Sequence, residues 1–332
     1  MKALLSRQPG GPATLVIEDV PEPTAGPGEV RISVRACGVN YPDLLIIQDL
    51  YQYKPPRPFI PGGEIAGVVE AVGEGVDKVT PGDRVLMSPA PGGMAQKVVG
   101  PATSCWKIQD TMPFDEAAAL LLTYGTSQHA LHDRAQLRAG ETLLVLGAAG
   151  GVGLAAVELG KAIGARVVAA ASSAEKLALA LDHGADEAVQ YPTGSLDKNA
   201  ARALTDRFKT ACGAAGAQVI YDPVGGDYTE AALRAIGWQG RHLVVGFTAG
   251  IPKLPLNLAL LKSCQIIGVY WGEFTKRFPA THAANVSALM ALYQEGRIKP
   301  AVTEHFPLQR AGEAIGRLGA RDVRGKVVVM IE

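Results

Sequence analysis

The chain has 332 residues, of which 48% are hydrophobic and 19% charged, a balance typical of a globular protein with two domains. Lys plus Arg and Asp plus Glu both number 32, so no excess charge attracts nucleic acid or an anionic membrane. The N-terminal segment lacks the apolar core of a signal peptide, and no apolar run reaches the roughly 18 residues that span a bilayer. We therefore expect a cytoplasmic protein whose scattered cysteines (Cys37, Cys105, Cys212 and Cys264) stay reduced.

Short strands alternate with turns in the first third of the chain. β-branched and apolar runs predict strands at residues 15–20, 29–36, 65–72, 84–87 and 95–99. Pro- and Gly-rich clusters such as residues 25–28 and 80–83 separate them. Closely spaced strands of this kind predict a closed or partly closed antiparallel barrel.

Beyond Phe114 the pattern changes to alternating strands and helices. Helices are predicted at residues 115–122, 125–133, 152–163, 174–183, 198–210, 228–235 and 282–295. Strands are predicted at residues 143–146, 166–171, 188–189, 219–221, 241–245 and 265–270, with a terminal strand at 326–331. Alternation of apolar strands with helices predicts an α/β domain whose parallel sheet is covered on both faces.

A glycine-rich turn follows the strand at residues 143–146. It reads Gly-Ala-Ala-Gly-Gly-Val-Gly from Gly147 to Gly153 and leads directly into an apolar helix. Glycine lets a pyrophosphate approach the backbone, and the N–H groups and dipole of the following helix face the anion. Ala148 stands where the first glycine of a dinucleotide fingerprint is usual. The strand and helix around the turn favour cofactor binding by Ala149, Gly150, Gly151, Val152 and Gly153 over a merely glycine-rich bend.

The end of the next strand indicates which nicotinamide cofactor binds. NAD-binding domains place a carboxylate there to bond the ribose hydroxyls, whereas this chain has Ser172, Ser173 and, one turn later, Lys176. Two hydroxyls and an ammonium would accept a 2′-phosphate, and we therefore expect NADPH. The alternative is that Ser172 only caps the helix and Lys176 is solvated.

These segments together resemble the zinc-free quinone oxidoreductase branch of the medium-chain dehydrogenase/reductase superfamily. The resemblance rests on the glycine turn and on residues 38–43, 50–56, 219–225 and 268–272, and it covers essentially the whole chain. It implies a GroES-like barrel in residues 1–122, a Rossmann domain in residues 123–272 and a return to the barrel in residues 273–332. It also implies a substrate cleft between the domains and homodimers that pair Rossmann sheets edge to edge.

The resemblance bears on metal binding as well. Zinc-dependent members carry a cysteine where Asn40 stands and a histidine where Gly63 stands. The lobe that would bind a structural zinc lacks its cysteines, because residues 88–94 contain none. A tetrahedral zinc site needs three or four converging donors, and the pair His129 and His132 shares at most a helix face. We therefore expect no metal.

Without a metal, hydride transfer to an electron-poor acceptor such as a quinone needs little more than orientation. Asn40 is the first candidate for a polar group at the site, either to orient the acceptor oxygen or the cofactor ribose, or alternatively as part of a turn before Pro42. Tyr51 and Tyr53 are candidates for a hydrogen-bond or proton donor, or alternatively anchor a loop. The resemblance places Thr126 beside the nicotinamide.

The resemblance implies further cofactor contacts. Tyr191 would lie at the adenosine-phosphate end, and backbone groups of Val245, Gly246, Phe247, Val269 and Tyr270 at the nicotinamide end. Arg321 is an additional candidate for the 2′-phosphate, although an isolated arginine is usually solvated.

Two other functions fit the same residues. An enoyl-thioester or α,β-unsaturated carbonyl reductase would share the scaffold and NADPH but needs a proton donor, which Tyr51 or Tyr53 would provide. An NADPH-binding protein with negligible turnover is the other, although a hydride donor at a cleft usually has an acceptor.

Overall fold

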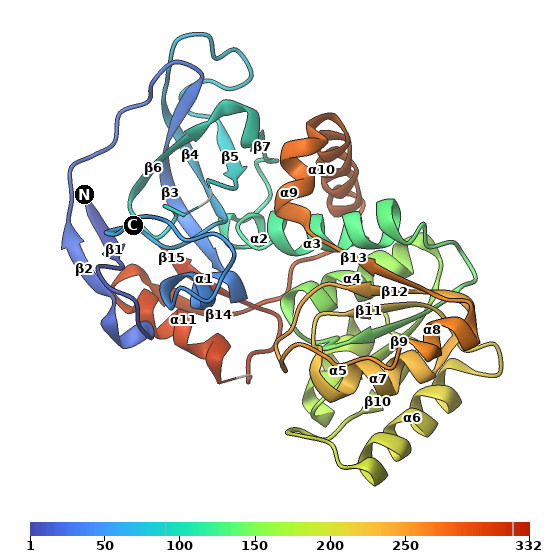
Figure 1. Cartoon of the computed structure of the whole chain (residues 1–332). Coiled ribbons are helices and arrows are strands. Elements are labelled where there is room, and N and C mark those ends of the chain that lie inside the picture. Colours follow the sequence, from blue (N-terminus) through green and yellow to red (C-terminus); the bar gives the residue numbers. More distant parts are fainter. Residues whose placement is uncertain (90, 321) are drawn as a thin grey trace. The chain divides into compact units, whose positions relative to one another are not determined.

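The computed structural model describes residues 1–89, 91–320 and 322–332. Two compact units make up the fold, each with its own internal contacts. The first contains Met1–Leu122 and Pro300–Glu332, and the second contains Thr123–Lys299. Figure 1 labels the elements of both units.

The first unit is built mainly from strands. These are β1 (Lys2–Leu5), β2 (Val16–Asp19), β3 (Glu29–Val39), β4 (Ile65–Val72), β5 (Arg84–Met87), β6 (Lys97–Pro101), β7 (Cys105–Lys107), β14 (Val302–Pro307) and β15 (Lys326–Met330). Three α-helices accompany them: α1 (Tyr41–Ile47), α2 (Phe114–Ala117) and α11 (Ala311–Gly319). All strands predicted in this part of the chain form, and α1, β1, β7, β14 and α11 are additional.

The long strand β3 organises this unit. It pairs with β4 along one edge, and along the other edge with β6 near its start and with β15 near its end. The main sheet has seven strands, and its neighbours are antiparallel except for β14 and β15. Inward-facing side chains of β3, including Val30, Ile32 and Val34, lie in a buried apolar core. The register Val327↔Val39 brings the C-terminal strand beside residue 40.

The second unit alternates strands and helices. Its strands are β8 (Thr142–Leu146), β9 (Arg166–Ala171), β10 (Glu187–Gln190), β11 (Ala217–Asp222), β12 (Ile236–Val244) and β13 (Gln265–Gly268). Its helices are α4 (Gly151–Ile163), α5 (Ala174–Asp182), α6 (Lys198–Cys212), α7 (Gly226–Arg234), α8 (Asn257–Lys262), α9 (Trp271–Arg277) and α10 (Pro279–Gln294). Helix α3 (Leu121–Gln128) begins at the boundary and continues as a π-helical segment, His129–Arg134.

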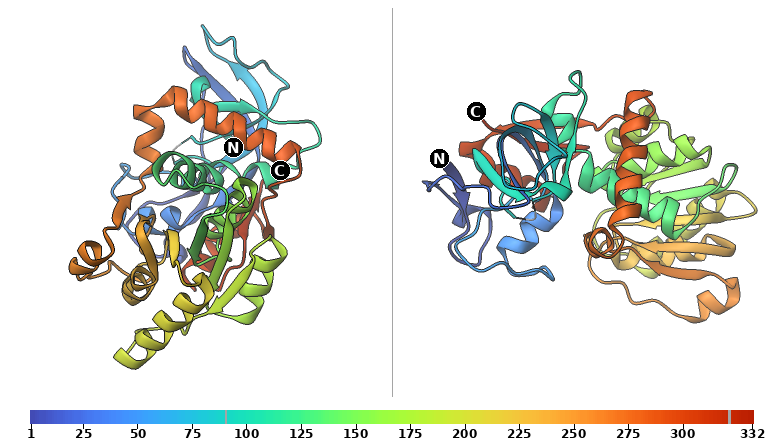
Figure 2. Two further views of the ribbon diagram at one scale, coloured as in Figure 1. Left: turned by 90° about the vertical axis from the view of Figure 1, so that its right-hand side faces the viewer. Right: turned by 90° about the horizontal axis from the view of Figure 1, so that it is seen from above.

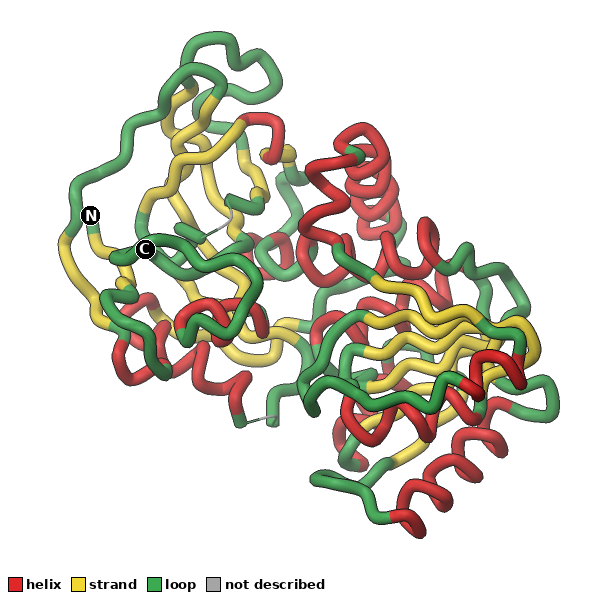
Figure 3. The backbone as a smooth tube through the Cα atoms, viewed as in Figure 1, coloured by secondary structure: helices red, strands yellow, loops and turns green. Residues whose placement is uncertain are grey.

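The six strands form one parallel sheet in the order β10-β9-β8-β11-β12-β13. Helices lie on both of its faces (Figures 2 and 3), which confirms the predicted parallel sheet. The apolar run of β8 is buried at every position, as expected for a central parallel strand. From β8 the chain moves outward to β10, then returns to β11 on the other side. Ligands of such sheets bind at this reversal, beyond the carboxyl ends of β8 and β11.

The predicted domain division needs one correction. Residues 273–299 belong to the second unit, whereas the sequence placed the return to the barrel at residue 273. Packing explains the difference. The Phe274 ring of α9 stacks on His129 with 3.8 Å between centroids, and the Asn285 amide of α10 donates to Asp133 at 2.8 Å. The end of the parallel strands at β13 therefore does not end the domain.

Candidate active site

The glycine turn has the geometry that a dinucleotide requires. Gly147 follows β8 with φ of +60°, in the left-handed region that favours glycine, and its carbonyl accepts the N–H of Gly150 at 3.0 Å. A Cβ atom at Gly153 would lie 2.1 Å from the Gly147 carbonyl oxygen, so only glycine lets α4 start this close to the turn. The first glycine position of the dinucleotide fingerprint is occupied by Ala148. The structure shows that Gly147, one residue earlier, makes the turn instead.

The start of α4 is available to an anion. The first N–H groups of a helix have no partner within it, and α4 is long enough for its dipole to matter. A Cβ at Gly150, the residue before α4, would make one ordinary contact, at 3.5 Å from the Gly147 carbonyl oxygen, so the described residues leave room beside the turn. Open space next to unpaired backbone donors suits a pyrophosphate.

A second turn, after β11, packs against the glycine turn. Asp222 is buried and its Oδ1 accepts the N–H groups of Val224 and Gly225, both at 2.9 Å. Its Oδ2 accepts the Thr229 hydroxyl at 2.6 Å and lies 3.3 Å from His242 Nε2. Burial acts to raise the pKa of Asp222, but His242 and these donors lower it overall. Nothing in the sequence pattern singled out Asp222 as the residue that shapes this loop.

The end of β9 has the polar residues predicted there. Ser173, not Ser172, caps α5, because its Oγ accepts the Lys176 N–H at 3.3 Å. Lys176 Nζ reaches back to Ser172 Oγ at 3.5 Å, so the ammonium and the hydroxyl lie together. The suggestion that Ser172 serves only as a helix cap is therefore wrong. Glu175 is exposed on the helix.

The remaining predicted cofactor residues of the second unit lie on loops and helix ends. Tyr191 is buried and its ring lies 4.9 Å from that of Tyr228; burial raises the pKa of its phenol, while a hydrogen bond with the Gly147 backbone opposes this. Val245 and Gly246 follow β12, and both N–H groups donate to the Asp222 carbonyl. The side chains of Phe247, after β12, and Tyr270, after β13, are exposed, at 44% and 53%. Val269 bonds to the Val244 carbonyl through its N–H.

Thr126 is half-buried on α3. The next residue, Ser127, is buried, with its Oγ donating to the Val152 carbonyl at 2.9 Å and lying 2.8 Å from the Tyr221 hydroxyl. These contacts fix α3 against the first turn of α4, and so place Thr126 on the helix that adjoins the glycine turn.

Asn40 lies at the centre of a buried polar cluster in the first unit. It precedes α1 and is 6% exposed. Its Nδ2 donates to Glu64 Oε2 at 2.9 Å and to the Gly38 carbonyl at 3.2 Å, and its Oδ1 accepts from Lys326 Nζ at 2.7 Å. Glu64 and Lys326 were not predicted as site residues, because their types and spacing form no motif. They lie 262 residues apart in the sequence, and only the fold brings them into contact.

The two tyrosines considered as hydrogen-bond or proton donors follow α1 in the chain. Tyr51 is half-buried and Tyr53 is 49% exposed, and both lie in the irregular segment after α1. Arg321 lies outside the described residues.

Asp43 gives the first unit a pH-dependent contribution to stability. Its Oδ2 accepts the Asn40 N–H at 2.8 Å and its Oδ1 that of Gly62 at 3.2 Å. Burial raises the pKa of Asp43 to about 6, although these donors and Lys326 act to lower it. A carboxyl with a higher pKa in the folded chain binds its proton more tightly there, so its contribution to stability falls as the pH rises.

The difference in stability between the parent chain and Asp43→Asn should measure this pH-dependent contribution of Asp43. The free energy of unfolding of the parent relative to the variant should fall by up to about 3 kcal/mol between about pH 4 and pH 6. Urea unfolding at several pH values across this window measures it. A difference that stays constant with pH would contradict the raised pKa.

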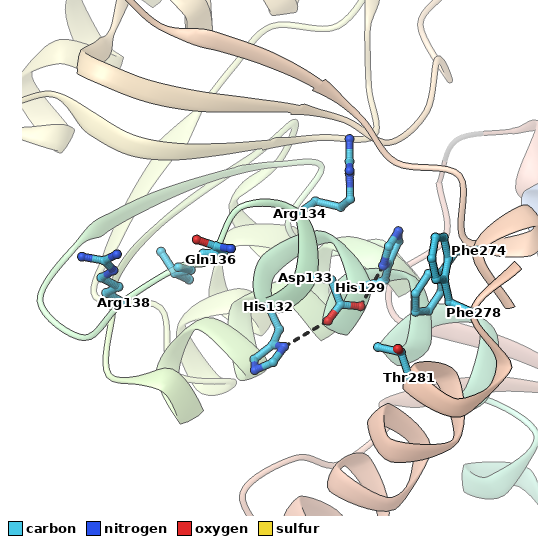
Figure 4. A pocket seen from close by; sticks show the side chains of 10 residues that line it. His129, His132, Asp133, Arg134, Gln136, Arg138, Phe274, Phe278 and Thr281 are labelled. Carbon is cyan, nitrogen blue, oxygen red and sulfur yellow. Dashed lines mark hydrogen bonds and ion pairs between the residues drawn. The ribbon is translucent and has the colours of Figure 1, made fainter.

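The two histidines considered as metal ligands bind one carboxylate instead. His129 Nδ1 lies 2.8 Å from Asp133 Oδ2, and His132 Nδ1 lies 3.1 Å from Asp133 Oδ1. Both line a hollow of about 620 Å³ whose lining residues all belong to the second unit and include none of the predicted site residues. Figure 4 shows the two histidine rings on either side of the Asp133 carboxylate. Over residues 1–89, 91–320 and 322–332, no three His, Cys, Asp or Glu side chains group as a metal site requires. Within the same ranges, no helix combines the length and apolar character needed to cross a bilayer.

Comparison with known proteins agrees with this arrangement. The family model described as "Alcohol dehydrogenase GroES-like domain" matches residues 26–111, and that described as "Zinc-binding dehydrogenase" matches residues 151–287. Quinone oxidoreductase-like protein 2 of Bos taurus is 38% identical over 320 residues, which cover 96% of this chain and 89% of the relative.

Solved structures agree over the full length. A mycobacterial protein in complex with NADPH has a TM-score of 0.91 and 32% identity, covering 99% of this chain and 100% of that one. The quinone oxidoreductase of Thermus thermophilus, also solved with NADPH, has a TM-score of 0.85 and 33% identity over 99% and 100% of the two chains. The two units are thus a GroES-like domain and a Rossmann-like domain, and the chain belongs to the quinone oxidoreductase-like branch of the medium-chain dehydrogenase/reductase superfamily.

Proposed function

We propose that this oxidoreductase transfers a hydride from NADPH to a quinone or a similar electrophilic acceptor without a metal ion. The observation that carries the proposal is the glycine turn at the reversal of the parallel sheet, where Gly147 and Gly153 leave no room for side chains and α4 presents its first N–H groups. Bound NADPH would supply the hydride, and the protein would hold and orient the reactants.

The choice of NADPH over NADH rests on the end of β9. Ser172, Ser173 and Lys176 offer hydroxyls and an ammonium, and no carboxylate follows β9 before the helix. A 2′-phosphate would be attracted there, whereas the ribose hydroxyls of NADH would find no acceptor carboxylate. Two of the similar solved structures hold NADPH.

A metal-free reaction is supported by the residues of the first unit. Asn40 and Gly63 replace two zinc ligands, and the Asn40 amide is engaged by Glu64 and Lys326. An ammonium ion 2.7 Å from Asn40 Oδ1 would repel a metal cation at the same place. Elemental analysis of purified, dialysed protein tests this; one equivalent of zinc per chain would refute it.

Several residues would contact the cofactor or the acceptor. We propose Asn40 and Thr126 as polar contacts at the reacting end and Tyr51 or Tyr53 as the hydrogen-bond or proton donor. Backbone groups of Val245, Gly246, Phe247, Val269 and Tyr270 would bind the carboxamide, and Tyr191 would lie near the adenosine phosphate.

The acceptor is tested by following NADPH absorbance with 1,4-benzoquinone and with an enoyl-CoA side by side. We expect the quinone to oxidise NADPH. If the two phenols can substitute for one another, the rate should be undiminished in each of the single variants Tyr51→Phe and Tyr53→Phe. If only the enoyl-CoA is reduced, the substrate is an unsaturated thioester and not a quinone. Tight NADPH binding without turnover of either would indicate a binding protein.

We also propose a homodimer that pairs the two sheets through β13. Among the strands that the structure describes, β13 has a neighbour, β12, on one side only. Apolar side chains are exposed on the strand, on α8 and on the residue before α8: Ile266 (38%), Leu260 (78%), Leu261 (62%) and Leu256 (70%). An edge strand with exposed apolar neighbours is suited to pairing with a second copy.

Replacing Ile266 with lysine is expected to separate such a dimer, because two charges would meet at the paired edge. Light scattering after gel filtration should show the mass fall from twice 34.7 kDa to 34.7 kDa. Val16→Lys, an equally exposed β-strand position in the first unit, is the control and should leave the mass unchanged. A monomeric parent chain would refute the dimer.

A further inference from the structure

The second unit has a hollow that shares no residue with the glycine turn or with the other predicted site residues. It is the hollow of about 620 Å³ lined by His129 and His132, and small-molecule sites typically have volumes of about 300–1,000 Å³. The π-helical segment His129–Arg134, the loop after it and the residues where α9 ends and α10 begins form its walls (Figure 4). The exposed apolar residues proposed for the dimer do not line it.

The backbone beside this hollow is unusual in two places. The segment His129–Arg134 is π-helical, and π-helical turns are rare and frequently occur at functional sites. Gln136, which follows it, has φ of +49°, in the left-handed region that a non-glycine residue seldom adopts. Arg241 Nη1 holds the loop in this conformation by donating to the Ala135 carbonyl at 2.7 Å. The side chains of the loop are therefore presented to the hollow by a fixed backbone.

The one carboxylate that lines the hollow is already engaged. Asp133 Oδ2 accepts the Asn285 amide at 2.8 Å and lies 2.8 Å from His129 Nδ1, while Oδ1 lies 3.1 Å from His132 Nδ1. Burial acts to raise the pKa of Asp133, but these three partners lower it overall. The carboxylate is thus ionised, and its oxygens are used within the protein.

Two arginines of the hollow lack such a partner. Arg134 donates through Nε to the Gly268 carbonyl at 3.2 Å, and its terminal N–H groups bond to none of the described residues. The Arg138 guanidinium makes no hydrogen bond within the described part of the chain, and neither arginine forms an ion pair there. Two permanent positive charges therefore line the hollow, against one negative charge that three groups share. A guanidinium presents a fork of N–H donors that matches the two oxygens of a carboxylate.

Aromatic rings form one side of the hollow. The His129 ring stacks on Phe274 with 3.8 Å between centroids, and the Phe278 ring lies 6.0 Å from that of Phe274. Phe278 is 57% exposed, so part of its ring is open to solvent. An open phenyl ring suits a flat apolar group, which would stack against it. Arg134 belongs to the same segment as His129, whereas Arg138 lies at the far end of the hollow from the phenylalanines (Figure 4).

We infer that this hollow is a second ligand site, which takes a small aromatic carboxylate. The Arg134 guanidinium binds the carboxylate, the aromatic ring stacks against Phe278, and Arg138 adds a second positive charge that attracts the anion. The inference involves neither the glycine turn nor NADPH, so it stands or falls independently of the proposed function.

Saturation-transfer NMR with benzoate and the full chain tests the inference. Benzoate should bind with a Kd of about 1 mM, as expected for a ligand of its size. Acetate lacks the ring and benzamide lacks the charge, so each should bind at least about tenfold more weakly. If inorganic phosphate binds more tightly than benzoate, the site takes a phosphate and the assignment to a carboxylate is wrong.

Variants of the lining residues locate the bound benzoate. Arg134→Met should raise the Kd about tenfold, and Arg134→Lys should recover only part of this, because an ammonium cannot pair with both oxygens in a fork. Phe278→Ser should raise the Kd about fivefold through loss of the stacked ring, and Arg138→Met about twofold. The side chains replaced are exposed, so the variants should fold, and urea unfolding midpoints close to that of the parent would verify this.

Arg202→Met is the matched control. Arg202 is an exposed arginine on α6, outside the hollow, so its loss removes the same charge and should leave the Kd for benzoate unchanged. Two results would overturn the inference. One is the absence of saturation transfer to benzoate at millimolar concentrations. The other is equal Kd values for Arg134→Met and Arg202→Met, which would show that benzoate binds elsewhere on the protein.

Discussion

Replacing Gly153 with alanine is expected to weaken NADPH binding strongly and to destabilise the second unit. The new Cβ would lie 2.1 Å from the Gly147 carbonyl oxygen, a backbone atom that cannot move without shifting the turn or α4. Overpacking of this kind lowers the free energy of unfolding by about 1–3 kcal/mol. The displaced N–H groups should weaken NADPH binding by about 100-fold, equivalent to roughly 3 kcal/mol. Urea unfolding and fluorescence titration measure the two effects.

Gly150→Ala separates binding from packing. Gly150 has φ of −82°, which alanine adopts freely, and its Cβ would make only an ordinary contact at 3.5 Å. Stability should therefore change by no more than about 0.5 kcal/mol. The methyl group would nevertheless occupy the space left for the pyrophosphate, and NADPH should bind about tenfold more weakly. Equal affinities for the parent and Gly150→Ala would show that the phosphates do not lie at this turn.

Replacing Ser172 with aspartate is expected to reverse the preference between the two nicotinamide cofactors. The carboxylate would lie beside the Lys176 ammonium, which now contacts Ser172 Oγ at 3.5 Å. It would neutralise that ammonium and repel a 2′-phosphate, while offering the ribose hydroxyls of NADH an acceptor. The ratio of kcat/KM for NADPH to that for NADH should fall by about 100-fold or more, because like charges at close range cost several kcal/mol.

Ser172→Ala is the matched control, since it removes the hydroxyl without adding charge and should lower the ratio by less than tenfold. Ser173→Ala should lower stability by about 1 kcal/mol through loss of the α5 cap, a separate effect. A ratio that Ser172→Asp leaves unchanged would place the 2′-phosphate elsewhere.

The Rossmann-like unit was readable from the sequence because its signals are local. The strand at residues 166–171 is found with the predicted bounds, and that at 143–146 with one residue more. Apolar runs, helix caps and glycine positions act over a few residues, so they can be recognised in the sequence without knowledge of the fold. Helix α3 shows the limit of local reading: a single helix was predicted at residues 125–133, whereas α3 ends at Gln128 and a π-helical segment follows.

Elements that depend on distant partners were missed. Helix α1 begins directly after Asn40 with a proline in its first turn, and only its packing on α11 and the core of the first unit reveals its role. The assignment of α9 and α10 to the second unit likewise depends on the contacts of Phe274 and Asn285 with residues about 150 positions earlier.

By itself the sequence determined the fold class, the place of the glycine turn and the polar residues after β9, because each depends on residue types within one strand–turn–helix unit. Only the tertiary structure decided which groups surround Asn40. Its two amide hydrogens and one oxygen position are used by Gly38, Glu64 and Lys326, the last of which comes from the C-terminal strand. The chemistry of a buried amide is set by the groups that the fold packs around it, and strand register, which no local pattern encodes, brought the ammonium there.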